Sequence, residues 1–274
     1  MLTVEALSVV YEQAGSVVRA VDGVSFSIEA GEIFALVGES GSGKSSVALA
    51  LTRLLPSDRC RLEGRVVLDG TDLLQVPEAA LREIRSGRIS YVFQDPGASL
   101  NPVLTIGEQL LETITLHTAA RGAEAKRLAV EWLERVGMAS ARERFGAYPH
   151  EFSVGMQQRV CLAMGLAARA AVLVADEPTT ALDVTTQVQI LRLLRSLQQA
   201  LRLTVLLVSH DLTVVERIAH RIGVMRAGRL VECGATSQVL RAPAHPDTKE
   251  LLRWRSTMRR QPGPPQPPDG SRHG

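Results

Sequence analysis

Eight residues of the sequence, "GESGSGKS" from Gly38 to Ser45, have the spacing G-x-x-x-x-G-K-[ST]. Glycines let a loop wrap around an anion without Cβ clashes, so that successive backbone N–H groups point inward. A lysine at this place reaches the β- and γ-phosphates, and the serine hydroxyl that follows it binds Mg²⁺. The motif therefore predicts a site for a nucleoside triphosphate. Its candidate phosphate-binding residues are Gly38, Glu39, Ser40, Gly41, Ser42, Gly43, Lys44, Ser45 and Ser46.

Two acidic residues follow a second apolar run, "AVLVADEP". In a parallel sheet ligands collect at the carboxyl ends of the strands, so Asp176 and Glu177 are expected beside the phosphate loop. Asp176 is predicted to hold Mg²⁺, directly or through water, and Glu177 to polarise the attacking water. "TVLLVSHD" places His210 at a third strand end, in reach of a γ-phosphate. The alternatives are a chance pair of acids and a structural histidine, and the phosphate loop weighs against both.

The flanking segments supply the strands and helices that position these residues. "GEIFALVG" is a short apolar strand and "KSSVALALTRLL" has a helical period, which argues against an isolated glycine-serine turn with a chance lysine. "AVLVADEP" and "TVLLVSHD" are apolar strands, with the helix "TTQVQILRLLRSLQQAL" between them. This alternation predicts an α/β fold with a largely parallel sheet covered on both faces.

Other parts of the chain have different patterns. Residues 2–10 and 17–28 alternate apolar and polar positions, and "GRVVLDG" continues this β-rich opening, which predicts an N-terminal antiparallel β subdomain. Residues 97–158 contain amphipathic helices and few strand signals, so we expect an inserted helical subdomain there. One domain is expected over residues 1–255. A Pro/Gly-rich tail over residues 256–274 is expected to be disordered.

Composition excludes several classes of protein. The chain has 274 residues, of which 45% are hydrophobic and 22% charged, with a net charge of +2, so a nucleic-acid partner is not expected. Cys60, Cys161 and Cys233 are far apart and form no CxxC pattern, which predicts a reducing compartment without disulfides or a zinc site. No signal peptide is recognisable, and Arg169 interrupts the longest apolar stretch. A cytosolic chain is expected, anchored by other chains if it works at a membrane.

These motifs, in this order, resemble the nucleotide-binding subunit of ABC transporters over nearly the whole chain, up to about residue 255. The phosphate loop is followed by "VFQDP" with Gln94, then by "FSVGM", "DEP", "ALD" and "SHD". The wording "FQDPGASLNP", "ADEPTTALDVTTQVQIL" and "PAHPDTKELL" resembles the ATPases of oligopeptide, dipeptide and nickel importers. Those often have "HPYT" where this chain has "HPDT", so Asp247 departs from the pattern. Peptide, nickel or a metallophore (metal-chelate) therefore stay open as cargo.

The resemblance implies a RecA-like P-loop NTPase core and roles for four further residues. Tyr11 would stack on adenine, the alternative being an exposed strand aromatic. Gln94 would contact Mg²⁺ and the attacking water, Asp183 would lie at a dimer seam, and His210 would hold the γ-phosphate. The implied activity is hydrolysis of ATP to ADP and phosphate at the cytoplasmic face of the inner membrane. The implied partners are a second ABC ATPase, transmembrane permeases and, indirectly, an extracytoplasmic substrate-binding protein.

The resemblance also bears on "FSVGM", where the usual wording has a glycine in place of Val154. In this family Ser153 and Gly155 would reach a γ-phosphate held by the partner ATPase. A valine restricts φ and adds bulk close to a ligand. We expect Val154 to weaken the partner's site, by about 2–4 kcal/mol if one donor to the phosphate is lost. This favours a heterodimer with one impaired site over a homodimer.

A second interpretation belongs to another class of protein. The chain also fits a non-transport ABC ATPase that acts as a scaffold or regulatory subunit of a soluble complex, as in phosphonate breakdown. Relatives in nucleic-acid repair are disfavoured, because no long coiled-coil insertion and no basic groove occur in the sequence. Recovery with multi-span membrane proteins would favour the transporter, and recovery in a soluble assembly would favour the alternative.

Overall fold

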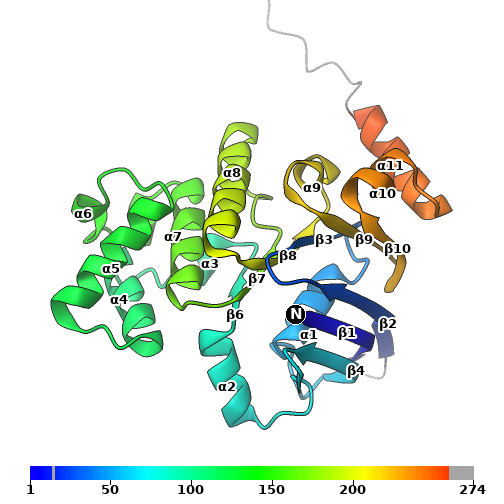
Figure 1. Cartoon of the computed structure of the whole chain (residues 1–274), viewed down its shortest axis with the longest axis horizontal. Coiled ribbons are helices and arrows are strands. Elements are labelled where there is room, and N and C mark those ends of the chain that lie inside the picture. Colours follow the sequence, from blue (N-terminus) through cyan, green and yellow to red (C-terminus); the bar gives the residue numbers. More distant parts are fainter. Residues whose placement is uncertain (14–15, 259–274) are drawn as a thin grey trace, which may run out of the picture.

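A computed structural model of the chain describes residues 1–13 and 16–258 (Figure 1). The tail expected from residue 256 lies, from residue 259 on, outside the described residues. Residues 256–258 are the end of helix α11 (Pro246–Met258) and not the start of a tail. No glycine or proline occurs between Asp247 and Gln261, so nothing in this stretch of sequence stops the helix at residue 255.

The larger of two sheets has six strands in the order β10-β9-β3-β8-β7-β6. All neighbours are parallel except β9 and β10, which form an antiparallel hairpin. The strands are β3 (Ile33–Gly38), β6 (Ile89–Val92), β7 (Val172–Asp176), β8 (Thr204–Ser209), β9 (Arg221–Arg226) and β10 (Arg229–Ala235). The largely parallel sheet predicted from the apolar runs is therefore present.

The second sheet is antiparallel and has the order β2-β1-β4-β5. It consists of β1 (Leu2–Gln13), β2 (Ser16–Ile28), β4 (Cys60–Leu68) and β5 (Thr71–Asp72). Alternate residues of β2 are buried near its end, as the apolar–polar alternation predicts for a half-buried strand. The β-rich opening of the sequence thus forms one antiparallel sheet.

Side-chain alternation along the central strands divides the core into two clusters. Phe34 and Leu36 of β3 pack with the antiparallel sheet, helix α1 (Lys44–Leu51) and helix α2 (Glu78–Gly87). Ile33, Ala35 and Val37 face the opposite way and pack with the other helices. All six residues of β3 are buried, which explains why its sequence is continuously apolar.

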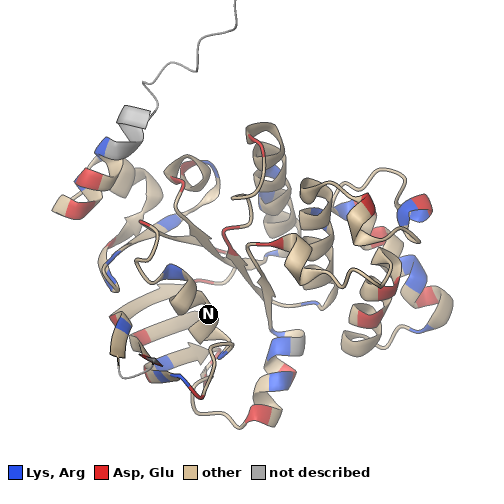
Figure 2. Cartoon of the chain, turned by 180° about the vertical axis from the view of Figure 1, so that it is seen from behind, with Lys and Arg blue, Asp and Glu red and all other residues tan. Residues whose placement is uncertain are grey.

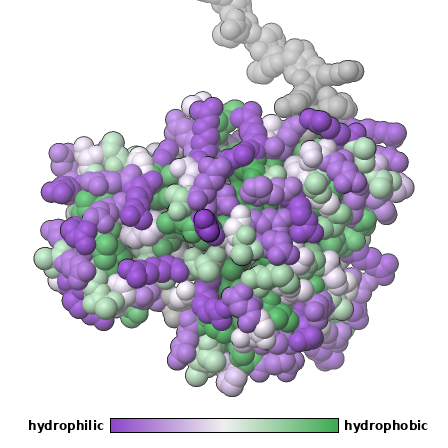
Figure 3. Space-filling model, in the orientation of Figure 1, coloured by the Kyte–Doolittle hydropathy of each residue, from purple (hydrophilic) through white to green (hydrophobic). Residues whose placement is uncertain are grey.

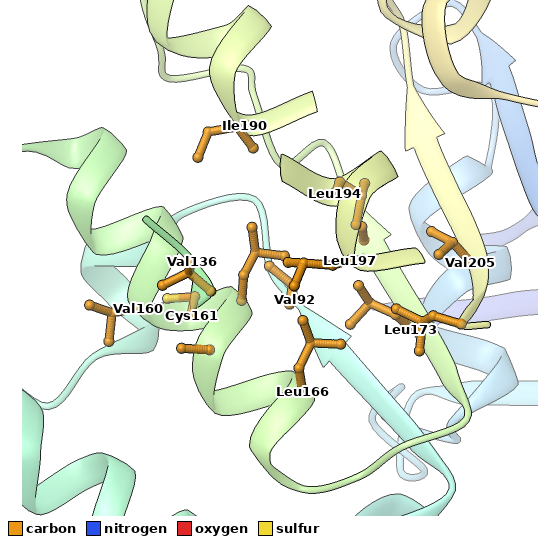
Figure 4. Packing of buried hydrophobic residues seen from close by; sticks show 14 of the residues in the cluster. Val92, Val136, Val160, Cys161, Leu166, Leu173, Ile190, Leu194, Leu197 and Val205 are labelled. Carbon is orange, nitrogen blue, oxygen red and sulfur yellow. The ribbon is translucent and has the colours of Figure 1, made fainter. Parts of the chain in front are cut away.

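The remaining helices supply most of the side chains that pack in the other cluster, together with Ile33, Ala35 and Val37. They are α4 (Ile106–His117), α5 (Gly122–Arg135), α7 (Val154–Ala167), α8 (Val184–Leu201) and α9 (Leu212–Ile218), with the short helices α3 (Pro96–Ser99), α6 (Ala141–Arg144) and η1 (Pro149–Glu151), and with α10 (Thr236–Arg241) near the end. In Figure 4, Leu173 of β7 and Val205 of β8 lie beside Leu194 and Leu197 of α8, while Leu166 of α7 points toward Val92.

Helices α3 to α6 and the start of α7 fall within the stretch expected to be a helical subdomain, and in Figure 1 they lie to one side of the sheets. The subdomain boundary at residues 97–158 stays a prediction. Helix α1 is shorter than expected, because it ends at Leu51 and Arg53 has a φ of 48°, in the left-handed region.

Charged residues of both signs are interspersed over the ribbon in Figure 2, and polar residues cover most of the face in Figure 3. Within residues 1–13 and 16–258, no helix combines the length and the apolar character that a bilayer crossing requires.

Candidate functional site

The phosphate loop connects β3 to α1 and adopts a backbone that glycine permits. Gly43, which caps the start of α1, has a φ of 101°, and a Cβ there would lie 2.3 Å from the carbonyl oxygen of Ala20. A Cβ on Gly38 would lie 2.2 Å from the carbonyl oxygen of Met225. Larger residues would therefore push the loop away from β2 and β9. The loop opens onto the first turn of α1, where helix N–H groups and the helix dipole favour an anion.

Lys44 lies inside this loop and is only 4% exposed. Its Nζ donates hydrogen bonds to the carbonyl oxygens of Gly38 at 3.0 Å and Glu39 at 2.8 Å. Burial lowers the pKa of Lys44, whereas the negative charges of Glu177 and Asp176 act in the opposite direction. The ammonium group thus lies between the loop backbone and the acidic strand end.

Asp176, at the end of β7, is buried and contacts the phosphate loop directly. Its carboxylate accepts hydrogen bonds from Ser45 Oγ at 3.1 Å and from the Tyr91 hydroxyl at 2.8 Å. Burial raises the pKa of the Asp176 carboxyl, and these two hydrogen bonds only partly oppose the shift. Such a group is unfavourable in its charged form and gains from a nearby cation.

The Ser45 hydroxyl and the Asp176 carboxylate fit Mg²⁺, which prefers oxygen ligands and takes one or two protein groups together with substrate phosphates and water. Gln94, which is predicted to add an amide oxygen, contacts Glu177, the residue that follows Asp176. No group of three or more His, Cys, Asp or Glu side chains suited to a metal occurs in the part of the chain that the structure describes. The donor set therefore fits a metal that is shared with a substrate better than a closed protein cage.

Glu177 lies at the centre of a second cluster. Its carboxylate oxygen Oε2 accepts a hydrogen bond from Thr180 Oγ1 at 2.8 Å, and it lies 3.1 Å from His210 Nδ1 and 3.4 Å from Gln94 Nε2. The backbone of Glu177 has a φ of 46°, which is uncommon for a residue other than glycine. The structure thus brings together three of the side chains for which catalytic roles were predicted.

Tyr11 lies at the other side of the phosphate loop. Its hydroxyl forms a hydrogen bond of 3.0 Å with Ser46 Oγ in the first turn of α1, and its ring is half-buried. The alternative of an exposed strand aromatic does not describe this position. The ring lies at the edge of the phosphate site, as a base-stacking role requires, and that role stays a prediction.

Ser153 and Asp183 cap two neighbouring helices away from the phosphate loop. Ser153 Oγ accepts from the N–H of Met156 at the start of α7, and Asp183 accepts from the N–H groups of Thr185 and Thr186 at the start of α8. The hydrogen bond from Thr186 is the main cause of the lowered pKa of Asp183. None of the hydrogen bonds of Ser153 or Asp183 within the described residues reaches the phosphate loop.

Gly155, in the first turn of α7, is buried against α8. A Cβ on Gly155 would lie 2.4 Å from Thr186 Cγ2, so this glycine lets the two helix starts approach closely. Val154 is 42% exposed and is the first residue of α7. The helix start at Val154 is a regular one, capped by Ser153, and its N–H group is retained. The expected effect of the valine on the backbone angle φ therefore does not arise in this structure. The bulk of the Val154 side chain is the remaining way in which it would weaken the partner's site.

Sequence reasoning missed two groups that orient the acidic residues. Tyr91 binds Asp176, and Thr180 binds Glu177. A signal for Tyr91 existed, because it lies in the strand that ends just before Gln94 and its ring would reach along the sheet edge. Thr180 follows the two acids by a few residues, but the sequence does not indicate whether Thr179 or Thr180 donates a hydrogen bond to Glu177.

The structure defines the class of the protein first. A parallel sheet whose strand β3 enters a glycine-rich loop and helix, with a serine and an aspartate paired at the strand ends, is the arrangement of a P-loop NTPase. The family model described as "ABC transporter" matches residues 21–180. The chain belongs to the ABC transporter family.

Curated relatives agree with this assignment. The peptidoglycan transport ATP-binding protein YejF of Agrobacterium fabrum is 47% identical over 92% of this chain and 46% of its own length. A putative peptide import ATP-binding protein of Brucella abortus is 47% identical over 92% of this chain and 76% of its own. The chain thus spans about half of the first relative and three quarters of the second.

Solved structures include a similar fold. A dimeric, post-hydrolysis state of the ATP-binding cassette MJ0796 with ADP and phosphate has a TM-score of 0.77 and 29% identity, covering 86% of this chain and 99% of that one. The structural likeness thus extends over most of the chain, and not over the phosphate loop alone.

Proposed function

We propose that the chain is the ATP-binding and ATP-hydrolysing subunit of an ABC importer that powers the uptake of peptides through partner permeases. Relatives named for peptide import and for peptidoglycan transport support the cargo class. Nickel and metal chelates, which the sequence also left open, have no such support among these relatives. The single observation that carries the activity is the pair of clusters at the strand ends, Ser45 with Asp176 and Glu177 with Gln94 and His210.

Each residue has a role in this mechanism that its position supports. The loop N–H groups and Lys44 neutralise the phosphate charge, and Ser45 and Asp176, with Gln94, hold Mg²⁺. When bound, Mg²⁺ withdraws charge from the phosphate oxygens. Glu177 orients and polarises the attacking water, with Thr180 fixing its carboxylate.

His210 and Tyr11 act at the two ends of the nucleotide. His210 lies against Glu177 and contacts the γ-phosphate, so it links the water-activating group to the charge that develops during transfer. Tyr11 stacks on the adenine ring beside the first turn of α1. The two residues together fix the triphosphate along the loop.

The proposed assembly contains a second ABC ATPase and sits at the cytoplasmic face of the inner membrane, as a peripheral subunit of transmembrane permeases. An extracytoplasmic substrate-binding protein contributes indirectly. Ser153 and Gly155 lie away from this chain's own phosphate loop, which supports their use by a partner ATPase. Val154 favours a sister subunit over a second copy of this chain.

The proposal is tested first by Glu177→Gln, which keeps the shape of the side chain but removes its charge. We expect Mg²⁺-dependent ATP binding to persist and steady-state hydrolysis to fall roughly 100- to 10,000-fold. Glu131→Gln, on the far helix α5, is the matched control and is expected to hydrolyse ATP as the wild type does. Equal hydrolysis by Glu177→Gln and the wild type would contradict the assignment.

Transport itself is tested by purifying the chain from membranes and identifying its partners. Multi-span membrane proteins in the complex, together with ATP-dependent peptide uptake into reconstituted vesicles, are the expected result. Recovery only in a soluble assembly would instead favour the scaffold or regulatory ATPase.

A further inference from the structure

Arg226, the last residue of β9, lies beside the tip of the phosphate loop. Gly38, the last residue of β3, is paired in register with Met225 of β9, so Glu39 after β3 and Arg226 of β9 are neighbours at the carboxyl ends of these strands. Arg226 Nη1 lies 3.9 Å from Glu39 Oε1. The guanidinium group therefore faces an acidic side chain of the predicted nucleotide site.

The same guanidinium contacts two acids of helix α11. Arg226 Nη1 lies 2.9 Å from Glu250 Oε2, and Arg226 Nε lies 3.8 Å from Asp247 Oδ1. Asp247 is the residue at which this chain differs from the "HPYT" motif of related importers, and in this structure it is an ion-pair partner of Arg226. Three carboxylates thus surround one guanidinium, two from α11 and one from the phosphate loop.

The start of α11 is itself fixed to the hairpin that carries Arg226. Glu232 of β10 accepts hydrogen bonds from the N–H groups of Ala244 at 2.8 Å and His245 at 3.0 Å. These bonds contribute to the lowered pKa of the Glu232 carboxyl, although burial acts against them. Helix α11 is therefore held in two places. Glu232 of β10 binds the backbone just before the helix, and Arg226 of β9 binds Asp247 and Glu250 within it.

The hairpin also supports the loop backbone. The N–H of Gly228, in the turn between β9 and β10, donates to the carbonyl oxygen of Ser42 at 3.1 Å. A cleft of about 240 Å³ separates the loop from α11 and is lined by residues 38–42, Arg226, Asp247 and Leu251. Arg226 thus connects the loop tip with α11 across this cleft.

Glu39 was predicted as part of the phosphate loop, and its side chain brings a negative charge to a loop that receives a polyanion. Its carboxylate is 60% exposed, and its negative charge is one of those that act on the pKa of Lys44, after burial and the charges of Glu177 and Asp176. A free carboxylate here would repel the phosphates over a distance comparable with the Debye length. The guanidinium of Arg226, 3.9 Å away, counters part of this charge and limits where the Glu39 carboxylate can lie.

We propose that Arg226 is a positioning residue for ATP binding: it holds the Glu39 carboxylate outside the phosphate cradle, and Asp247 and Glu250 of α11 fix the guanidinium in that place. This inference rests on the proposed binding of ATP by the chain. It gives the C-terminal helix a part in setting the affinity of the nucleotide site.

The test measures ATP affinity of the full chain by titration calorimetry with Mg²⁺ at low salt. Arg226→Ala is expected to weaken ATP binding roughly two- to fivefold, the range of an exposed ion pair. The same change in the Glu39→Gln background is expected to have no effect, because the repelling charge is gone. At high salt the difference between Arg226→Ala and the wild type is expected to close.

Arg229→Ala is the matched control, because Arg229 lies on the same hairpin but pairs with Asp22, 2.8 Å away, and not with the loop. It is expected to bind ATP as the wild type does. An affinity of Arg226→Ala equal to that of the wild type would overturn the inference. So would an equal loss in the Glu39→Gln background, which would indicate a general disturbance of the hairpin. Absence of ATP binding by the wild type would instead refute the proposed function.

Discussion

Asp176 shows how a single residue connects folding to function. Its carboxylate is buried against Ser45 and Tyr91, and its pKa is raised because burial outweighs these hydrogen bonds. A carboxyl whose pKa is raised on folding stabilises the fold below its ordinary pKa and loses that contribution as the pH rises through the raised value. At neutral pH, therefore, the ionised Asp176 opposes folding and favours a bound cation.

Asp176→Asn separates these two effects. The amide can accept from Tyr91 and donate to Ser45 Oγ, so the contacts persist without the charge. We expect a melting temperature at pH 7 to 8 equal to or above that of the wild type. We also expect the difference between the variant and the wild type to narrow as the pH falls toward the ordinary pKa of an aspartate, because the wild-type carboxyl then becomes protonated. The effect of Mg²⁺ on ATP affinity is expected to fall by roughly tenfold or more.

Thermal unfolding across pH and calorimetry with and without Mg²⁺ check both parts. A marked loss of stability in Asp176→Asn at neutral pH would contradict the first part, because it would show that the ionised carboxylate stabilises the fold. An unchanged response to Mg²⁺ would remove Asp176 from the metal site.

At this scale the sequence allowed the main groups to be predicted but not the groups that orient them. Lys44, Ser45 and Asp176 could be predicted because their spacing follows from what a phosphate and a metal require. Tyr91 could be noticed as an aromatic residue in the strand before Gln94, but its contact with Asp176 depends on how β6 lies beside β7. The contact of Thr180 depends on the turn after Glu177, which the sequence does not define. Arg226 was missed because its partner Glu39 lies far away in sequence.

At the scale of elements, the starts of α7 and α8 pack together at Gly155. In isolation, alanine in place of a helical glycine would favour the helix by about 1 kcal/mol. Here a Cβ would lie 2.4 Å from Thr186 Cγ2, and the β-branched side chain of Thr186 has few rotamers to escape into. Overpacking of this kind costs about 1–3 kcal/mol, so the contact outweighs the gain in helix propensity.

Gly155→Ala is therefore expected to lower the free energy of unfolding by about 1 kcal/mol. Combining it with Thr186→Ser, which removes Cγ2 but keeps the hydroxyl, is expected to restore wild-type stability or exceed it. Urea denaturation of the two single variants and the double variant provides the measurement. An additive loss in the double variant would mean that Gly155 does not pack against Thr186 in solution.

The elements themselves were predictable to different degrees. Apolar runs ending in polar residues located β3, β7 and β8, because strands buried on both faces have few other sequences available. The order of the strands was not predictable, since β3 pairs with β8 and β9, both far along the chain. The early end of α1 also escaped prediction, because "TRLL" continues a helical period while Arg53 adopts a left-handed backbone.

At the scale of the whole molecule, the helix starts that carry Ser153 and Asp183 lie apart from the phosphate loop. Val154 and Val184, the first residues of α7 and α8, are 42% and 76% exposed. Exposed apolar residues beside two capped helix starts suit a surface that a partner covers. This arrangement supports a site completed by two chains.

Val154→Gly tests the consequence in the assembled complex. Since the N–H groups at the start of α7 are retained, the bulk of the valine is the remaining obstacle to a phosphate. We expect ATP turnover of the complex to rise, while ATP affinity of the isolated chain stays unchanged. Steady-state hydrolysis by the purified complex checks this, and equal turnover would show that the valine is harmless.

The strand order has a consequence for biosynthesis. Both strand neighbours of β3 are made long after it, so in a nascent chain the buried strand β3 has no hydrogen-bonded strand partner until β8 and β9 have left the ribosome. The glycine loop also lies against Met225 of β9 and Gly228 of the turn after β9. A polypeptide that ends before β9 would contain the whole phosphate-loop motif but could not form the folded loop. During synthesis, a chaperone that shields β3 would protect the chain until β8 and β9 are made.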